Sequence, residues 1–440
     1  NTLGANGILI SRTAGTLNGS VNIQTGAIAA TTRGIDVDGG TLSLYYGGSI
    51  ATSGTTARSA EVTNIGAGGL TVAGNLTDTA LGINIANNTG GQVAFYGQSI
   101  ALTTQANANA VTLANNTGTA ITFSSAAGGN GIDIVASGTG NGIDFSGGGN
   151  LIVYSPGNSI QTANGQILNL VNGNIGSLGL VFDSLTSTGT VAGNAINISN
   201  LDSSSGGTVS ATTVNIAGTT GATSDGIFYG GGSTANVSLG TVTIANTGDE
   251  GIEINGAGNG TFAISNLTLN NTAGNGVEIN GSTNTVSILG GAIRTTNDPA
   301  GSGVYVLNGT GGVDIAASIT KTTAGNVVFV DNHETGTVTF SGALSATGGV
   351  DNGIVVQNVN SGSIVFSGSK TLTTGANTAV NLINNLGGTI SFPNGNMVIN
   401  TTSGTGLNYT GGGTLNVYGS GNTAQTATGQ VPNLVNGNGG

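Results

Sequence analysis

The sequence between residues 251 and 320 repeats one short pattern three times. The pattern reads GIEIN from Gly251, GVEIN from Gly276 and GVYV from Gly303, and two further short runs follow each of them. In every run apolar residues alternate with small or polar ones, and Gly, Asn and Ser bound the run. This alternation predicts β-strands rather than helices. Three strands per repeat, recurring about every 26 residues, predict one complete coil of a parallel β-helix.

In the Gly-apolar-x-apolar pattern, the first apolar residue is expected to point inward. This first inward residue recurs along the whole chain. A solenoid forms one continuous core at any length, so 440 residues need not divide into globular domains. We therefore predict an all-β protein: a right-handed parallel β-helix of about 17 coils, with about 26 residues per coil, as a single solenoid over residues 1–440. The predicted first inward residues are Ile8, Ile35, Ala60, Ile83, Val111, Ile143, Ile167, Ile196, Ile227, Ile252, Val277, Val304, Val327, Ile354, Val380, Leu407 and Val431.

A longer repeat lies over the short one. The sequence GIDFSGGG at 142–149 returns as GLNYTGGG at 406–413. Residues 1–175 resemble residues 270–440 in this way, about ten coils apart. Because the chain begins without Met and in the middle of a repeat unit, we expect it to be a piece of a longer protein built from such blocks.

Composition limits the possible partners. Charged residues make up 5 % of the chain, against about 25 % in ordinary globular domains. Six basic and eighteen acidic residues give a net charge of −12, which argues against binding of nucleic acid or of an anionic membrane surface. No apolar run reaches about 18 residues, so no membrane span is expected. The lack of cysteine rules out disulfides and thiolate metal sites and is compatible with an exported bacterial protein.

Asparagines recur four residues after many of the first inward residues. Asn tolerates the left-handed conformation that a tight bend between strands needs, and its amide can bond the equivalent Asn one coil away. Such side-chain ladders form where similar strands stack. Glycosylation of N-x-[ST] sequences is the alternative interpretation of these asparagines. The predicted structural ladder consists of Asn64, Asn87, Asn115, Asn200, Asn308, Asn358 and Asn384.

The chain offers few groups for catalysis. It has two Lys, four Arg and one His, and His333 lies in the sequence DNHE, which we interpret as a solvated turn. No Ser/His/Asp order, phosphate-binding loop or dinucleotide fingerprint is present. We therefore predict no catalytic residues, no enzymatic activity and no cofactor.

One acidic cluster is the best candidate for a metal site. Asp249, Glu250, Glu253 and Glu278 lie close together in the repeat pattern, and Glu253 and Glu278 share one outward position in adjacent coils. Stacked carboxylates repel each other unless a cation or a proton intervenes, and Ca²⁺ with oxygen ligands would satisfy them. The alternative is that these side chains splay apart into solvent.

A second calcium candidate is Asp133. The sequence GGNGIDI from Gly128 fits the calcium-binding nonapeptide of tandem β-helix repeats. That nonapeptide binds Ca²⁺ only in tandem, and the next similar phrase begins eleven residues later rather than nine. A chance match in a glycine-rich chain is therefore the alternative.

The repeat style resembles that of a known group of proteins. The strands LTLNN at 267–271 and GTVTF at 336–340, together with the Gly-apolar-x-apolar-x-Asn phrases, are similar to β-strand-repeat regions of large bacterial surface proteins. These include autotransporter passengers and filamentous haemagglutinin-like adhesins. The resemblance concerns repeat style along the whole chain and includes no catalytic or secretion motif.

This resemblance implies an extracellular or cell-surface right-handed β-helix that acts as a non-catalytic stalk, adhesin or fibre segment. Its partners would be neighbouring repeat blocks, other copies of itself end to end, or a glycan or host surface. The alternative function is a polysaccharide-binding or depolymerising β-helix, which would need clustered ionisable groups on one face.

Overall fold

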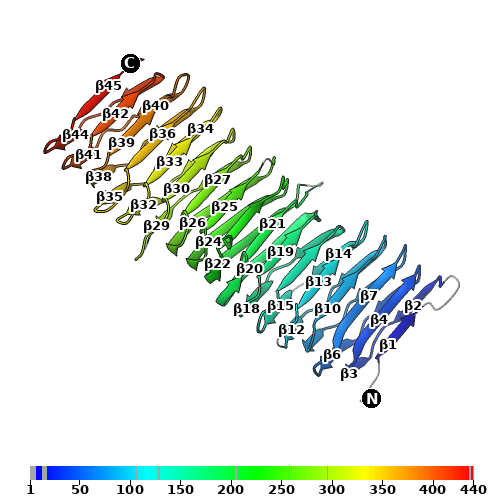
Figure 1. The fold of residues 1–440 in the computed structure, drawn as a ribbon. Helices are drawn as coiled ribbons and strands as arrows, with labels where there is room; N and C mark the ends of the chain where they lie inside the picture. Colours follow the sequence, from blue (N-terminus) through cyan, green and yellow to red (C-terminus); the bar gives the residue numbers. More distant parts are fainter. Residues whose placement is uncertain are drawn as a thin grey trace. The chain divides into compact units, whose positions relative to one another are not determined.

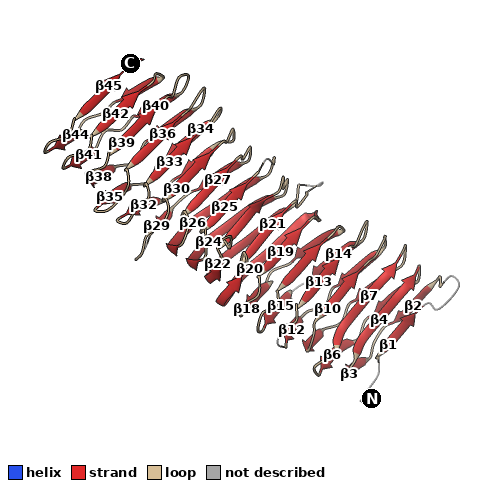
Figure 2. Cartoon of the chain, viewed as in Figure 1, coloured by secondary structure: helices blue, strands red, loops and turns tan. Residues whose placement is uncertain are grey.

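The computed structural model describes residues 6–11, 17–105, 107–125, 129–203, 206–256, 258–294, 296–435 and 438–439. Within these ranges every regular element is a β-strand and no helix occurs (Figure 2). The fold is a right-handed parallel β-helix of about 16 turns with about 26 residues per turn, which confirms the predicted class. The chain divides into two compact units, Asn1–Ala217 with Ser233–Ser238, and Gly218–Gly232 with Leu239–Gly440. Both units are built from the same coil.

Within each unit, the first strand of each coil pairs with the first strands of the neighbouring coils, and we call these strands the first sheet (Figure 1). In the first unit these strands are β1 (Ile8–Ser11), β4 (Arg33–Gly40), β7 (Arg58–Ile65), β10 (Ile83–Ala86), β13 (Val111–Ala114), β16 (Ile143–Ser146), β19 (Leu168–Val171) and β21 (Ile196–Ser199). In the second unit they are β23 (Ile227–Gly230), β25 (Ile252–Asn255), β27 (Val277–Asn280), β30 (Val304–Leu307), β33 (Val328–Asp331), β36 (Ile354–Gln357), β39 (Val380–Ile383), β42 (Leu407–Thr410) and β45 (Pro432–Val435).

The remaining strands form the second sheet, which completes each coil. In the first unit they are β2 (Ser20–Ile23), β3 (Ala27–Ala30), β5 (Ser43–Tyr46), β6 (Ser49–Ser53), β8 (Gly69–Val72), β9 (Leu76–Thr79), β11 (Gln92–Phe95), β12 (Ile100–Thr104), β14 (Ala120–Ser124), β15 (Ile132–Ala136), β17 (Asn150–Tyr154), β18 (Ser159–Thr162) and β20 (Asn174–Ala192). In the second unit they are β26 (Thr261–Thr272), β28 (Thr285–Ile288), β29 (Gly291–Ile293), β31 (Val313–Ile315), β32 (Ser318–Lys321), β34 (Thr337–Phe340), β35 (Leu344–Thr347), β37 (Ser363–Phe366), β38 (Lys370–Gly375), β40 (Thr389–Phe392), β41 (Met397–Thr401), β43 (Thr414–Val417), β44 (Thr423–Thr426) and β46 (Asn438–Gly439). The strands β22 (Thr208–Thr220) and β24 (Asn236–Thr247) contribute residues to both units.

Three predicted first inward residues are wrong by one position. The strand partners of Ile143, Val304 and Leu407 are Leu168, Val328 and Pro432 rather than Ile167, Val327 and Val431. At the first two sites both neighbouring apolar residues are fully buried, one in the strand and one in the corner before it. Two adjacent apolar residues give no alternation, so only the pairing with the next coil identifies which one opens the strand.

The strands of successive coils pair in register, so equivalent interior side chains lie one above another in a column. In the second unit the rings of Phe340 and Phe366 stack at 5.2 Å between centroids, and those of Phe366 and Phe392 at 5.1 Å. In the first unit Phe95 and Phe123 stack at 5.2 Å with planes only 5° apart. Parallel pairing residue by residue produces these stacks, because it places equivalent side chains one strand spacing apart.

The matching phrases of the predicted long repeat lie at first-sheet strands. β16 and β42 carry the matching phrases, as do β19 and β45. The coils that begin at β21, β23 and β25 lie between the two predicted repeat regions. In these coils the second sheet consists of the long strands β22, β24 and β26, instead of the two short strands of most other coils. The strand β20, in the coil that begins at β19, is also long, so the long second-sheet strands are β20, β22, β24 and β26.

We expect Phe366→Ala to lower the free energy of unfolding by about 3–5 kcal/mol, because it removes the middle ring of a fully buried stack. Urea denaturation followed by circular dichroism measures the change. The matched control is Val365→Ala, since the Val365 side chain faces outward on the same strand. An equal loss in both variants would contradict the role of the stack.

Candidate functional site

The predicted asparagines lie at the ends of seven of the first-sheet strands. All seven have φ between 48° and 58°, in the left-handed region. Asn115 donates to the side chain of Asn87 at 3.3 Å, which joins two of the predicted residues directly. Other ladder partners lay outside the predicted set: Asn200 donates to Asn172 at 3.0 Å, and Asn332 donates to Asn308 at 2.9 Å. Asn64 and Asn358 donate instead to the carboxylates of Asp38 and Asp331.

A second asparagine ladder lies inside the solenoid, and the sequence analysis did not identify it. Asn88, Asn116 and Asn385 each follow a corner asparagine and are completely buried. Asn88 donates to the side chain of Asn116 at 2.8 Å, and Asn116 donates to the Ile85 carbonyl at 2.7 Å. The Asn-Asn doublets were the signal that could have revealed it. A residue that follows a left-handed corner points inward, and a buried amide there needs partners.

The acidic cluster forms around a residue that sequence reasoning missed. Carboxyl oxygens of Asp225, Glu250 and Glu253 all lie within 4.8 Å of one another. Asp225 is 1 % exposed and Glu250 8 % exposed. Asp225 and Glu250 hold equivalent places, each directly before the Gly that precedes a first-sheet strand. This equivalence was the signal for Asp225.

The other predicted acidic residues lie at the margin of this cluster. Glu278 is the strand partner of Glu253, as expected, and it is linked to Glu250 because the Asn275 amide donates to both carboxylates, at 2.8 and 3.3 Å. Asp249 raises the pKa values of Asp225 and Glu250 through its charge, but it is not one of the three converging groups.

Burial and like charge keep protons on the cluster. Desolvation, followed by the charge of Glu253, raises the pKa of Asp225 to about 9. Burial raises the pKa of Glu250 to about 7, although a backbone N–H of Asn275 opposes the shift. Burial also raises the pKa of Glu278. The cluster can thus lower its repulsion by holding protons, and its oxygen-only donor set is also of the kind that a Ca²⁺ ion accepts.

Asp133 is not brought to this cluster. It faces outward on β15 of the first unit and accepts a short hydrogen bond from the Ser159 hydroxyl. The described residues place no group of three metal-ligating side chains around Asp133. Gly128, which opens the predicted calcium phrase, lies outside the described residues.

The prediction of a solvated turn at His333 is wrong. The ring is completely buried, and neither nitrogen makes a hydrogen bond to the described residues. Asn332 has a φ of 52°, so His333 takes the inward position that Asn88 takes in another coil. Gly309 and Gly362 of the adjacent coils leave room for the ring. Burial lowers the pKa of the imidazole.

The two lysines also point into the solenoid. Lys321 donates to the Gly301 carbonyl at 2.7 Å, and its ammonium lies 3.4 Å from a carboxylate oxygen of Asp298. Lys370 donates to the Phe366 carbonyl at 2.9 Å and lies 5.7 Å from the centre of the Phe392 ring. Both side chains are completely buried, and burial lowers the pKa of each. These cations are therefore engaged in packing and hydrogen bonding rather than offered to a surface.

Comparison of the chain with protein-family models, curated proteins and solved structures finds no match. Across the described residues, no helix has the length and apolar character needed to cross a membrane.

We expect Asp225→Asn to raise the melting temperature at pH 8 and to reduce the dependence of stability on pH. The pKa of Asp225 is about 9 in the folded chain, whereas its ordinary pKa, expected in the unfolded chain, is about 3.9. Between these two pH values the folded chain keeps the Asp225 proton. The unfolded chain does not hold it there, so stability falls as pH rises through that window. Thermal unfolding at pH 5 and pH 8 measures the effect. The matched control, Asp314→Asn at the exposed position of β31, should leave the pH dependence of stability unchanged. A wild-type pH dependence in Asp225→Asn would contradict the assignment.

Proposed function

We propose that this chain is a non-catalytic structural segment of an extracellular stalk or fibre on a bacterial cell surface, with neighbouring repeat blocks as its partners. The observation that carries the proposal is that each coil finds its bonding and packing partners in the neighbouring coil. Backbone pairs, corner amides and interior rings all find their partners one coil away, as at Asn88 with Asn116 and at Phe366 with Phe392. A unit whose contacts are mainly between neighbours suits extension by repetition.

The placement of the ionisable groups supports a function without catalysis. His333, Lys321 and Lys370 are buried and have no access to a substrate. Asp225 lies 1 % exposed within the acidic cluster and would hold its proton at neutral pH. Depolymerising activity on acidic glycans would instead need acid, base and cationic groups that converge on one accessible face.

The proposed extracellular location rests on composition and on the repeat style. The chain has no cysteine, and its charged residues are only 5 % of the total. Outward strand positions carry mainly hydroxyl and amide side chains, for example Asn381, Asn408 and Asn433, which form a ladder at 2.8 and 2.7 Å. Such a surface keeps its interactions when ionic strength changes, because few of them depend on charge.

We expect the purified chain to give dispersed particles in electron microscopy and no release of reducing ends from acidic or neutral polysaccharides. The physical reason is that, among the described residues, the outward acidic and basic side chains that converge, Arg33 with Asp36 and Glu61, are already ion-paired with one another. Turnover that persists through repurification would overturn the proposal in favour of a depolymerising β-helix. Long filaments would identify a second copy, docked end to end, as the partner instead of a neighbouring block.

The proposal includes no resident metal, so we expect chelation with EDTA to leave the melting temperature unchanged. Protons on Asp225 and Glu250 can relieve the repulsion that a cation would otherwise relieve. Thermal unfolding with EDTA and with added calcium provides the measurement. A calcium-dependent rise that disappears in Asp225→Asn but remains in Asp133→Asn would show that the acidic cluster binds the ion after all.

A further inference from the structure

A groove lined by glycines and amide side chains follows the corner between the two sheets in the first unit. It has a volume of about 620 Å³ and crosses four successive coils, those that begin at β13, β16, β19 and β21. At a strand spacing of about 4.8 Å, four coils give a groove on the order of 15 Å long. The groove is therefore an elongated channel rather than a compact pocket.

Glycines open the floor of this groove. Gly148 and Gly149 have φ of 93° and 94°, and Gly173 lies at the matching corner of the next coil. A Cβ atom at Gly149 would approach the Asn116 carbonyl oxygen to 2.8 Å. The close approach of the two backbones thus requires glycine, and the corner carries no side chain that would fill the channel.

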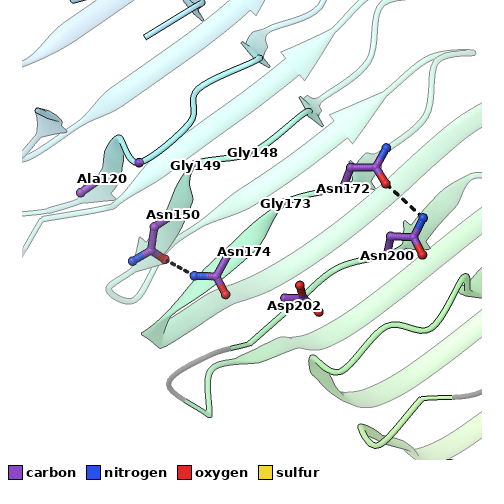
Figure 3. A pocket seen from close by; sticks show the side chains of 10 residues that line it. Ala120, Gly148, Gly149, Asn150, Asn172, Gly173, Asn174, Asn200 and Asp202 are labelled. Carbon is purple, nitrogen blue, oxygen red and sulfur yellow. Dashed lines mark hydrogen bonds between the residues drawn. The ribbon is translucent and has the colours of Figure 1, made fainter. Parts of the chain in front are cut away.

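Two pairs of amides lie along the groove, one on each side of Gly173 (Figure 3). Asn174 donates to Asn150 at 3.4 Å, and Asn200 donates to Asn172 at 3.0 Å. Each primary amide carries two N–H donors and an oxygen with two lone pairs, so a single bond within the Asn172–Asn200 pair uses part of its capacity. The pair keeps donors and acceptors in fixed positions on the exposed corner.

The charge in the groove is negative and small. Asp202 is exposed, and one of its carboxylate oxygens accepts from the Thr234 hydroxyl at 3.1 Å. Among the described residues that line the groove, none is Lys, Arg or His and none is aromatic. A carboxylate without a neighbouring cation disfavours phosphate, sulfate and uronate groups. Amides with a carboxylate match neutral hydroxyl groups, which both donate and accept.

We propose that this groove binds a neutral oligosaccharide laid along the solenoid axis. The length of the channel fits an extended chain, the amides and Asp202 supply hydrogen bonds to its hydroxyl groups, and the charge excludes acidic sugars. Without an aromatic ring to stack on, the groove binds the oligosaccharide with a dissociation constant in the millimolar range, about −4 kcal/mol. This binding goes beyond the proposed structural function and does not depend on it.

The test uses the whole chain and soluble oligomers of neutral hexoses and of hexuronic acids, with saturation-transfer NMR as the readout. We expect a neutral oligomer to bind and the uronic oligomers not to bind. No binding of any neutral oligomer at about 10 mM, above the expected range, overturns the proposal. Stronger binding of uronic oligomers overturns it as well, because the assigned chemistry would then be wrong.

Two variants locate the binding. Ala120→Tyr places a ring in the groove from an outward, half-buried position on β14, and it should weaken binding about tenfold or more. Ala101→Tyr is the matched control, since Ala101 holds an outward, half-buried position on β12 outside the groove. Asn150→Ala removes one amide without adding bulk and should weaken binding several-fold. Retained melting temperatures establish that the variants fold. Wild-type affinity in both Ala120→Tyr and Asn150→Ala overturns the assignment of the site.

Discussion

Parallel hydrogen bonding in register between successive coils is the constraint on which the other features depend. It places each residue one strand spacing from its equivalent, so every position becomes a column. A column favours side chains that can pack or bond with copies of themselves. Phenylalanine does so by stacking, as at Phe340 and Phe366, and asparagine does so because its amide both donates and accepts. The composition of the chain follows from this requirement more than from any demand of a ligand.

Carboxylates are the side chains that suit a column least, because equivalent copies repel each other. Where acidic residues do stack, a cation, an amide or a proton intervenes. Arg33 is ion-paired with both Asp36 and Glu61, which are strand partners. Asn275 joins Glu250 to Glu278, and burial raises the pKa of Asp225 to about 9. Asp225, Glu250 and Glu253 all lie in the coils outside the long repeat. The corresponding outward column of other coils holds either carboxylates, as at Asp36 and Glu61, or bonded amides, as at Asn381, Asn408 and Asn433.

The number of residues per coil could be predicted from the sequence, because apolar and polar residues alternate within each strand and the first inward residues recur at regular intervals. The left-handed corners could also be anticipated, because few residues other than Asn and Gly adopt that conformation readily. The sequence could not show whether the side chain of a corner residue points into the solenoid or toward solvent. His333 follows a corner asparagine within a polar stretch, and its burial depends on the room left by Gly309 and Gly362 in other coils. Asp225 was missed for a related reason, because its neighbours Glu250 and Glu253 become close only through stacking.

The corners are also where one coil can differ from the next with little loss of stability. The strands are held by register on both sides, so a change there disturbs two neighbouring coils. A corner is held mainly by one left-handed residue and its amide bond, so its length and bulk can vary. The groove at Gly149 and Gly173 arises from such variation, since short glycine corners lie beside the longer one that carries Asp202. A solenoid with repeated strands and variable corners can therefore combine a structural role along its length with selective binding at particular coils.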